Sequence, residues 1–297
     1  MPDSESKNSP AVHPNHLRDI AVRIAEDAAA HVRKRRPEVF GDGGADRVTA
    51  AGTVQAKSTP TDPVTVVDTE TEQLVRDLLA ELRPGDAVLG EEGGGAADSI
   101  DGIRWVVDPI DGTVNFMYGI PAYAISVAVQ IDGRSVAGAV VDVAREVTYS
   151  AALGAGATRT NADGTSTRLR CNDVDSVSMA LMATGFGYGS ARRAEQGRII
   201  AALLPRVRDV RRIGSAALDL CMVASGQVDA HFEHGLSPWD WAAGALIAAE
   251  AGADVQLPGP EVMSAAGEPV VAAAPGLATE LRAVFDELGV YAAIPDA

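Results

Sequence analysis

The sequence first indicates a helix near the N-terminus. Apolar residues recur there at intervals of three or four: Leu17, Ile20, Ile24, Ala28 and Val32. This is the spacing of one face of an α-helix. Asn15 is placed to cap the helix, the basic run at 33–36 suits a last turn because of the helix dipole, and Pro37 predicts the helix end. The polar residues 1–14 are expected to form a disordered tail.

A second helix and two buried strands follow in the chain. Pro63 suits the first position of a helix, which is expected to end before Pro84. Apolar runs at 87–89 and 105–107 predict buried strands, and each leads into a loop with acidic residues. The glycine-rich segment 41–56 between the helices predicts a loop or ribbon.

From residue 124 the pattern predicts an antiparallel meander, and from residue 172 it alternates between strand and helix. The meander strands are expected at 126–131, 135–142 and 146–150, with Asp-Gly at 132–133 as a hairpin turn. Further strands are expected at 179–184, 230–232, 253–257 and 270–274. Helices are expected near 191–203, 215–225, 238–251 and 276–288.

These elements predict an α+β fold with layers in the order αβαβα. We expect three regions along the chain: the tail at 1–14, an N-terminal α+β part at 15–172 with the acidic loops, and a C-terminal α/β part at 173–297. The two larger parts are expected to complete one active site. No internal repeat is present in the sequence.

Charge and composition exclude several classes of protein. The 297 residues include 41 acidic and 25 basic side chains, which give a formal charge of −16. Such a surface repels nucleic-acid phosphates and anionic lipids, so we expect neither as a partner. Apolar residues make up 46% and charged residues 22%, which excludes a disordered chain. Two cysteines are too few for a disulfide framework, and the sequence has neither the apolar core of a signal peptide nor an apolar stretch of membrane-spanning length. We therefore expect a cytoplasmic location.

Acidic residues lie at the ends of several predicted elements. They are Asp62 with Asp68, Glu91 with Glu92, Asp108 with Asp111, and Asp240. Each alone fits a simpler role, because Asp-Pro-Ile-Asp-Gly is a favourable turn sequence, Gly-Glu-Glu-Gly suits a solvated loop, and an aspartate in a first helical turn suits the helix dipole.

Together the acids predict a metal site. A sharp turn after a buried strand brings Asp108, Asp111 and the carbonyl of Ile110 to one point. Oxygen ligands of this kind suit Mg²⁺, and the absence of His and Cys from these segments argues against Zn²⁺. Gly112 and Thr113 can open a short helix whose amides face an anion. This combination is suited to binding and cleaving a phosphate ester.

Four motifs in order resemble those of the inositol monophosphatase family, within the superfamily of Mg²⁺-dependent, lithium-sensitive phosphatases. They are the run from Lys57 to Asp68, Gly-Glu-Glu-Gly at 90–93, Asp-Pro-Ile-Asp-Gly-Thr at 108–113, and Trp-Asp-Trp-Ala-Ala-Gly at 239–244. Segment 212–217 and Glu233 also match, and the chain is most similar to actinobacterial members. The resemblance covers residues 15–290, while 41–56 and 93–103 depart from the common pattern.

The resemblance implies roles for individual residues. The first Mg²⁺ would be bound by Glu91, Asp108 and the Ile110 carbonyl, a second by Asp108, Asp111 and Asp240, with a third ion possible near Glu91. Glu91 and Thr113 would position the attacking water, and Asp68 would support Thr113. The substrate would contact Asp111, Gly112, Thr113, Ser215, Ala216, Glu233 and Asp240. Lys57 and Asp62 would support the metal loops, and the assembly would be a homodimer.

The activity implied is hydrolysis of myo-inositol monophosphate, a small phosphate monoester, to myo-inositol and phosphate by metal-activated water. Histidinol phosphate, fructose 1,6-bisphosphate and 3′-phosphoadenosine 5′-phosphate remain alternative substrates on the same fold. A different class of function is a protein-binding regulator that keeps the phosphatase fold. A serine-based hydrolase is not supported, because the sequence has no Gly-x-Ser-x-Gly motif with a suitable nucleophile.

Overall fold

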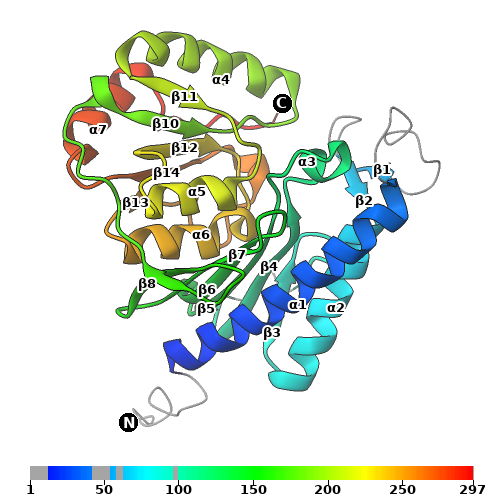
Figure 1. The fold of residues 1–297 in the computed structure, drawn as a ribbon. Coiled ribbons are helices and arrows are strands. Elements are labelled where there is room, and N and C mark those ends of the chain that lie inside the picture. Colours follow the sequence, from blue (N-terminus) through cyan, green and yellow to red (C-terminus); the bar gives the residue numbers. More distant parts are fainter. Residues whose placement is uncertain (1–12, 42–53, 58–62, 96–99, 297) are drawn as a thin grey trace.

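Five layers of secondary structure stack in the order helix, sheet, helix, sheet, helix (Figure 1). The computed structural model describes residues 13–41, 54–57, 63–95 and 100–296. A seven-stranded sheet and a five-stranded sheet alternate with three pairs of helices. The first pair is α1 (Pro14–Phe40) and α2 (Val66–Leu82), the pair between the sheets is α5 (Ala216–Ala224) and α6 (Pro238–Glu250), and the pair outside the five-stranded sheet is α4 (Ser190–Leu203) and α7 (Ala278–Leu288). The expected αβαβα architecture is confirmed.

The seven-stranded sheet contains the predicted meander and extends beyond it. Its strands lie in sequence order: β3 (Ala87–Gly90), β4 (Ile103–Asp111), β5 (Ala124–Ile131), β6 (Arg134–Asp142), β7 (Val147–Ala152), β8 (Gly156–Thr160) and β9 (Ser166–Arg168). Only β3 and β4 pair in parallel. Asp132 and Gly133 both have positive φ, 50° and 76°, as a tight hairpin turn requires. The last two strands were not expected, because neither Gly-Ala-Thr-Arg-Thr in β8 nor the short, exposed Ser-Thr-Arg in β9 shows a clear alternation of apolar and polar residues.

The five-stranded sheet is mixed and has the order β11-β10-β12-β14-β13. Its strands are β10 (Leu181–Thr184), β11 (Asp209–Arg211), β12 (Ala230–His234), β13 (Asp254–Gln256) and β14 (Pro269–Ala273). The short, charged edge strand β11 was not expected. Short helical turns complete the chain: α3 (Thr113–Tyr118) and the 3₁₀ helices η4 (Val177–Met179), η5 (Leu204–Arg206) and η6 (Ser264–Ala266). Segment 169–180 connects the two sheets.

The prediction for the first helix is wrong at both ends. His13, not Asn15, is the cap residue: its Nδ1 accepts a hydrogen bond from the Asn15 amide at 3.3 Å. The helix also continues through Pro37. Only one turn follows this proline, and that turn buries Phe40, whose ring packs edge-on against Phe116 at 5.5 Å. The packing of Phe40 therefore outweighs the hydrogen bond that Pro37 cannot donate.

The predicted start of the second helix is also wrong. Pro63 lies in the short strand β2 (Pro63–Thr65), which pairs with β1 (Val54–Ala56), and α2 begins at Val66. Thr65 and Asp68 form a capping box that fixes this start. Asp62, most of the predicted tail at 1–14 and most of the predicted loop at 41–56 lie outside the described residues.

Helix α6 packs closely on the seven-stranded sheet and brings its first turn to the end of β4. A Cβ atom at Gly138 of β6 would lie 3.0 Å from Ala243 Cα, so glycine permits this approach. The Ser126 hydroxyl of β5 donates to the Trp239 carbonyl at 3.1 Å. Among the described residues, no helix is both long and apolar enough to cross a membrane.

We predict that Gly138→Val destabilises the protein by about 1–3 kcal/mol, because the added side chain overpacks the contact between β6 and α6. Gly197 of α4 is the matched control. A Cβ there meets nothing within 4 Å, so Gly197→Ala should stabilise the helix by up to about 1 kcal/mol. The midpoints of denaturant-induced unfolding show whether each variant loses or gains stability. An unchanged midpoint for Gly138→Val would contradict the close approach of α6 to β6.

Candidate active site

Three aspartates converge where β4 meets α6. One carboxylate oxygen each from Asp108, Asp111 and Asp240 lies within 4.8 Å of the others. β4 does not end at Asp108 as expected but continues to Asp111, with a register shift between the two residues. This irregularity replaces the expected turn and aims both carboxylates at one place. Asp240 lies in the first turn of α6, as predicted.

Each of these aspartates is held through one oxygen by a backbone amide. Asp108 Oδ1 accepts from the Ile110 amide at 3.0 Å, and Asp240 Oδ2 accepts from the Ser237 amide at 2.6 Å. Asp111 Oδ2 accepts from the Ala217 amide at 2.7 Å and from the Ser215 hydroxyl at 2.6 Å. These bonds orient the carboxylates and leave the second oxygen of each for another ligand.

The electrostatics of this cluster fit a divalent cation. Burial, followed by the negative charges of neighbouring carboxylates, raises the pKa of Asp108 and Asp240 well above the usual range. Burial also raises the pKa of Asp111, to about 6, although hydrogen bonds from Ser215 and Ala217 oppose this rise. Three ionised carboxylates this close, two of them buried and one half-buried, repel one another unless a cation neutralises them. Since all the donors are carboxylate oxygens, the set suits Mg²⁺ or Mn²⁺.

Glu91 lies beside the aspartates, and its side chain is paired with a lysine. Its Oε1 accepts from Lys57 Nζ at 2.8 Å, and Glu92 Oε1 accepts from the same ammonium at 2.6 Å. Burial opposes the charge on Lys57, but both carboxylates raise its pKa above the usual range. Burial also raises the pKa of Glu92 to about 7. The structure thus places Lys57 and Glu91 together at the edge of the aspartate cluster.

Thr113 opens α3 with its hydroxyl between two acceptors. Oγ1 lies 3.1 Å from Asp68 Oδ1 and 3.0 Å from the Ile110 carbonyl oxygen. Asp68 is fully buried, and its other oxygen accepts from the amide and the hydroxyl of Thr65. Gly112, which precedes the helix, has φ 96°, and a Cβ there would lie 3.0 Å from the Ala122 carbonyl oxygen, so only glycine fits. This helical turn is therefore rigidly placed beside Asp111.

A cavity of about 1170 Å³ opens onto these groups. Seven of the predicted site residues line it: Glu91, Asp111, Gly112, Ser215, Ala216, Glu233 and Asp240. Thr113 and Asp108 are only 7% and 1% exposed and are not part of its wall. Burial raises the pKa of Glu233 to about 8, and the positive charge of Arg212, which also lines the cavity, opposes this rise. All the predicted substrate residues except Thr113 therefore line one cavity, and two of them, Asp111 and Asp240, belong to the aspartate cluster.

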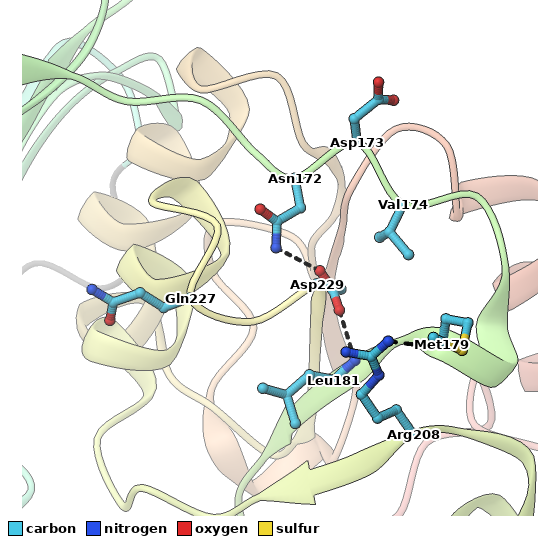
Figure 2. Close-up of a pocket in the computed structure, with 8 residues that line it drawn as sticks. All are labelled: Asn172, Asp173, Val174, Met179, Leu181, Arg208, Gln227 and Asp229. Atoms are coloured by element: carbon cyan, nitrogen blue, oxygen red, sulfur yellow. Dashed lines mark hydrogen bonds between the residues drawn. The ribbon is translucent and has the colours of Figure 1, made fainter.

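A smaller cavity of about 330 Å³ lies where segment 169–180 meets the five-stranded sheet (Figure 2). Its one buried carboxylate, Asp229, accepts from Asn172 Nδ2 and from the Leu181 amide, both at 2.7 Å (Figure 2). Arg208 lies against the sulfur of Met179 at 3.7 Å. With both oxygens of Asp229 engaged, these groups connect the segment to the sheet and offer no reactive site.

Glu72, which holds the Gly-Glu-Glu-Gly loop in place, was not predicted from the sequence. Its buried carboxylate accepts from the amides of Glu92 and Gly93 at 2.7 and 2.8 Å, and from Arg76 Nε at 2.9 Å. A Cβ at Gly90 or Gly93 would lie 2.5 or 2.6 Å from this carboxylate, which explains both glycines. The available signal was helical spacing, since Asp68, Glu72 and Arg76 follow at intervals of four on one face of α2.

Comparison with known proteins gives consistent matches over nearly the whole chain. Residues 13–289 match the family model described as the inositol monophosphatase family. An inositol-1-monophosphatase SuhB of Mycobacterium tuberculosis (strain CDC 1551 / Oshkosh) is 58% identical, covering 97% of this chain and 99% of that protein. A Nus factor SuhB of Vibrio cholerae is 36% identical, covering 82% and 85%. The solved structure of Mycobacterium tuberculosis SuhB has a TM-score of 0.78 and 53% identity, covering 94% and 99%.

We predict that Glu72→Gln weakens Mg²⁺ binding about tenfold, because the loop that carries Glu91 loses its charged anchor. Glu70→Gln is the matched control on the same helix, since Glu70 pairs with Arg35 and not with the loop. The Mg²⁺-dependent rise in melting temperature measures the affinity of both variants. Equal affinity for Glu72→Gln and wild type would show that the anchor does not affect the cation site.

Proposed function

The chain belongs to the inositol monophosphatase family and is a phosphoric monoester hydrolase, and from this premise we propose that it hydrolyses myo-inositol monophosphate to myo-inositol and phosphate. The observation that carries the proposal is the aspartate cluster beside a cavity that Glu233 also lines. The family implies a divalent metal cofactor. We propose that it is Mg²⁺, with two or three ions in each active site.

The proposed cation ligands come from three elements. Glu91, Asp108 and the Ile110 carbonyl would bind one ion, and Asp108, Asp111 and Asp240 a second. When bound, Mg²⁺ supplies charge neutralisation of the phosphate, acidification of a water ligand and stabilisation of the leaving alkoxide. The amides that fix the three aspartates keep their second oxygens in place for this binding. Lys57 balances the charge of the Glu91 loop.

The proposed reaction needs an oriented water and a held phosphate. Thr113 can accept a hydrogen bond from the attacking water while its own hydroxyl hydrogen points to Asp68 or the Ile110 carbonyl, and Glu91 would orient the same water. The amides of Gly112 and Thr113 would donate to the phosphate oxygens. Because these groups are fixed before substrate arrives, little reorganisation is required in the transition state.

The choice of inositol among phosphate esters rests on Glu233. Its carboxyl group lines the cavity together with Ser215 and Ala216, and it can form hydrogen bonds with vicinal hydroxyl groups. Gly185 makes room for it, since a Cβ there would lie 2.1 Å from Glu233 Oε2. Histidinol phosphate, fructose 1,6-bisphosphate and 3′-phosphoadenosine 5′-phosphate are the competing substrates to test in the same assay.

The alternative of a protein-binding regulator draws support from the relative named Nus factor SuhB. The complete aspartate cluster favours hydrolysis instead, since a binding role alone needs no converging buried carboxylates. We further propose a cytoplasmic homodimer. Cys171 and Cys221 are buried free thiols, which suits a reducing compartment, and light scattering would measure the oligomeric state.

We predict that Asp108→Asn lowers kcat/KM at least about a hundredfold, because it removes a charge shared by both proposed ions. In the metal-free protein the same change should raise the melting temperature at neutral pH. Folding raises the pKa of Asp108. At any pH above the pKa that this group has in the unfolded chain, Asp108 therefore lowers the stability of the folded chain, because folding opposes its ionisation. Activity assays and melting curves with and without Mg²⁺ test both statements; wild-type Mg²⁺ affinity in this variant would contradict the ligand assignment.

We predict that Thr113→Ala lowers kcat about a hundredfold with little change in KM, because the hydroxyl that orients the water is lost. Thr113→Ser keeps the hydroxyl and should recover most of the activity. Steady-state kinetics on both variants measure kcat and KM separately. A rise in KM alone would assign Thr113 to substrate binding.

We predict that Glu233→Gln lowers kcat/KM for inositol 1-phosphate by about three- to a hundredfold and leaves p-nitrophenyl phosphate nearly unaffected. The second ester offers no polyol for the carboxylate to bind. Released phosphate or nitrophenol is measured for the two substrates in parallel. Equal losses on both would place Glu233 in folding or metal support and remove the local argument for inositol.

A further inference from the structure

A second group of metal-type ligands lies behind the wall of the active-site cavity. His231 and Glu233 occupy alternate positions of β12, so both side chains lie on the same face of the strand. Asp219 belongs to α5, which packs against β12. One ligand atom from each of these three residues lies within 4.8 Å of the others. None of the three belongs to the aspartate cluster.

The side-chain polar atoms of Asp219 and His231 have no hydrogen-bond partner among the described residues. Asp219 is 1% exposed and His231 is 0% exposed, yet both carboxylate oxygens and both ring nitrogens are unpartnered. The closest approach, from His231 Nδ1 to Asp219 Oδ2, is 3.7 Å, which is too long for a hydrogen bond. Buried groups of this kind are costly and require a ligand or another compensation.

We propose that Asp219, His231 and Glu233 bind a divalent transition-metal ion of the Zn²⁺ class. Two carboxylates and a neutral imidazole balance a charge of +2, as a buried site requires. An imidazole ligand favours Zn²⁺ or Co²⁺ over Mg²⁺, and bonds of about 2.0–2.2 Å in a tetrahedral site hold ligand atoms roughly 3.3–3.6 Å apart. The 3.7 Å separation of Nδ1 and Oδ2 is close to that spacing.

Glu233 connects this site to the active site. Its carboxylate also lines the large cavity, which provides an entry route for the ion. His231 is fully buried, and a histidine side chain binds a metal through its neutral imidazole. The inference itself concerns metal binding and does not depend on the proposed substrate.

Co²⁺ is the probe that distinguishes the two sites. The full-length protein is stripped of metal, saturated with Mg²⁺ and titrated with Co²⁺ while the visible spectrum is recorded. Four-coordinate Co²⁺ with a nitrogen ligand absorbs strongly in the visible, whereas six-coordinate Co²⁺ with oxygen ligands absorbs weakly. We expect strong bands that saturate at one equivalent and disappear when Zn²⁺ is added. Absence of strong bands in the wild-type protein overturns the proposal.

Two conservative variants identify the ligands. Asp219→Asn and His231→Gln should each weaken Co²⁺ binding at least tenfold, roughly the loss seen for changes around metal sites. His234→Gln is the matched control, because His234 lies on the same strand and its Nε2 already bonds the Val290 carbonyl oxygen. Circular dichroism checks folding, and if a variant fails to fold, the wild-type titration decides. Wild-type Co²⁺ affinity in both folded variants overturns the assignment.

Discussion

Repulsion among three converging aspartates, of which Asp108 and Asp111 are buried and Asp240 is half-buried, is the constraint on which the rest of the active site depends. Asp108, Asp111 and Asp240 are brought within 4.8 Å of one another by elements from opposite halves of the chain. Such a group is unstable by itself, because burial and like charge both oppose ionisation. The surrounding structure therefore has to hold the carboxylates in place, and a divalent cation relieves the repulsion while it provides the chemistry of phosphate hydrolysis.

The surrounding contacts divide this task among several segments. Backbone amides fix one oxygen of each aspartate. Asn115 of α3 donates to the carbonyls of Ala122 and Ile213 at 2.7 and 2.9 Å and so joins the β4–α3 turn to the segment before α5. Glu72 anchors the loop of Glu91 from below. Each of these residues acts by position, so the arrangement of the acidic oxygens is set before any ligand binds.

Local patterns in the sequence predicted the fold and the acidic residues, but not the contacts that depend on tertiary packing. Alternating and helical patterns indicated most strands and helices, and the Asp-Pro-Ile-Asp-Gly-Thr run indicated two of the three aspartates that converge. The predictions for Pro37 and Pro63 were wrong because each considered only the backbone preference of proline and not the tertiary contacts of the neighbouring residues. Phe40 needs the helix to continue past Pro37, and pairing with β1 places Pro63 in a strand. The unpartnered atoms of Asp219 and His231 could not be predicted from sequence, since only the packing of α5 on β12 brings them together.

Anomalous diffraction from a crystal soaked in Mn²⁺ tests the central claim most directly. Mn²⁺ shares the preference of Mg²⁺ for oxygen ligands and can be located by its scattering. The account predicts a peak within bonding distance of the second carboxylate oxygens of Asp108, Asp111 and Asp240, with Glu91 turned toward the metal. A map with no peak among these three aspartates, at Mn²⁺ concentrations that support phosphate release, would contradict it.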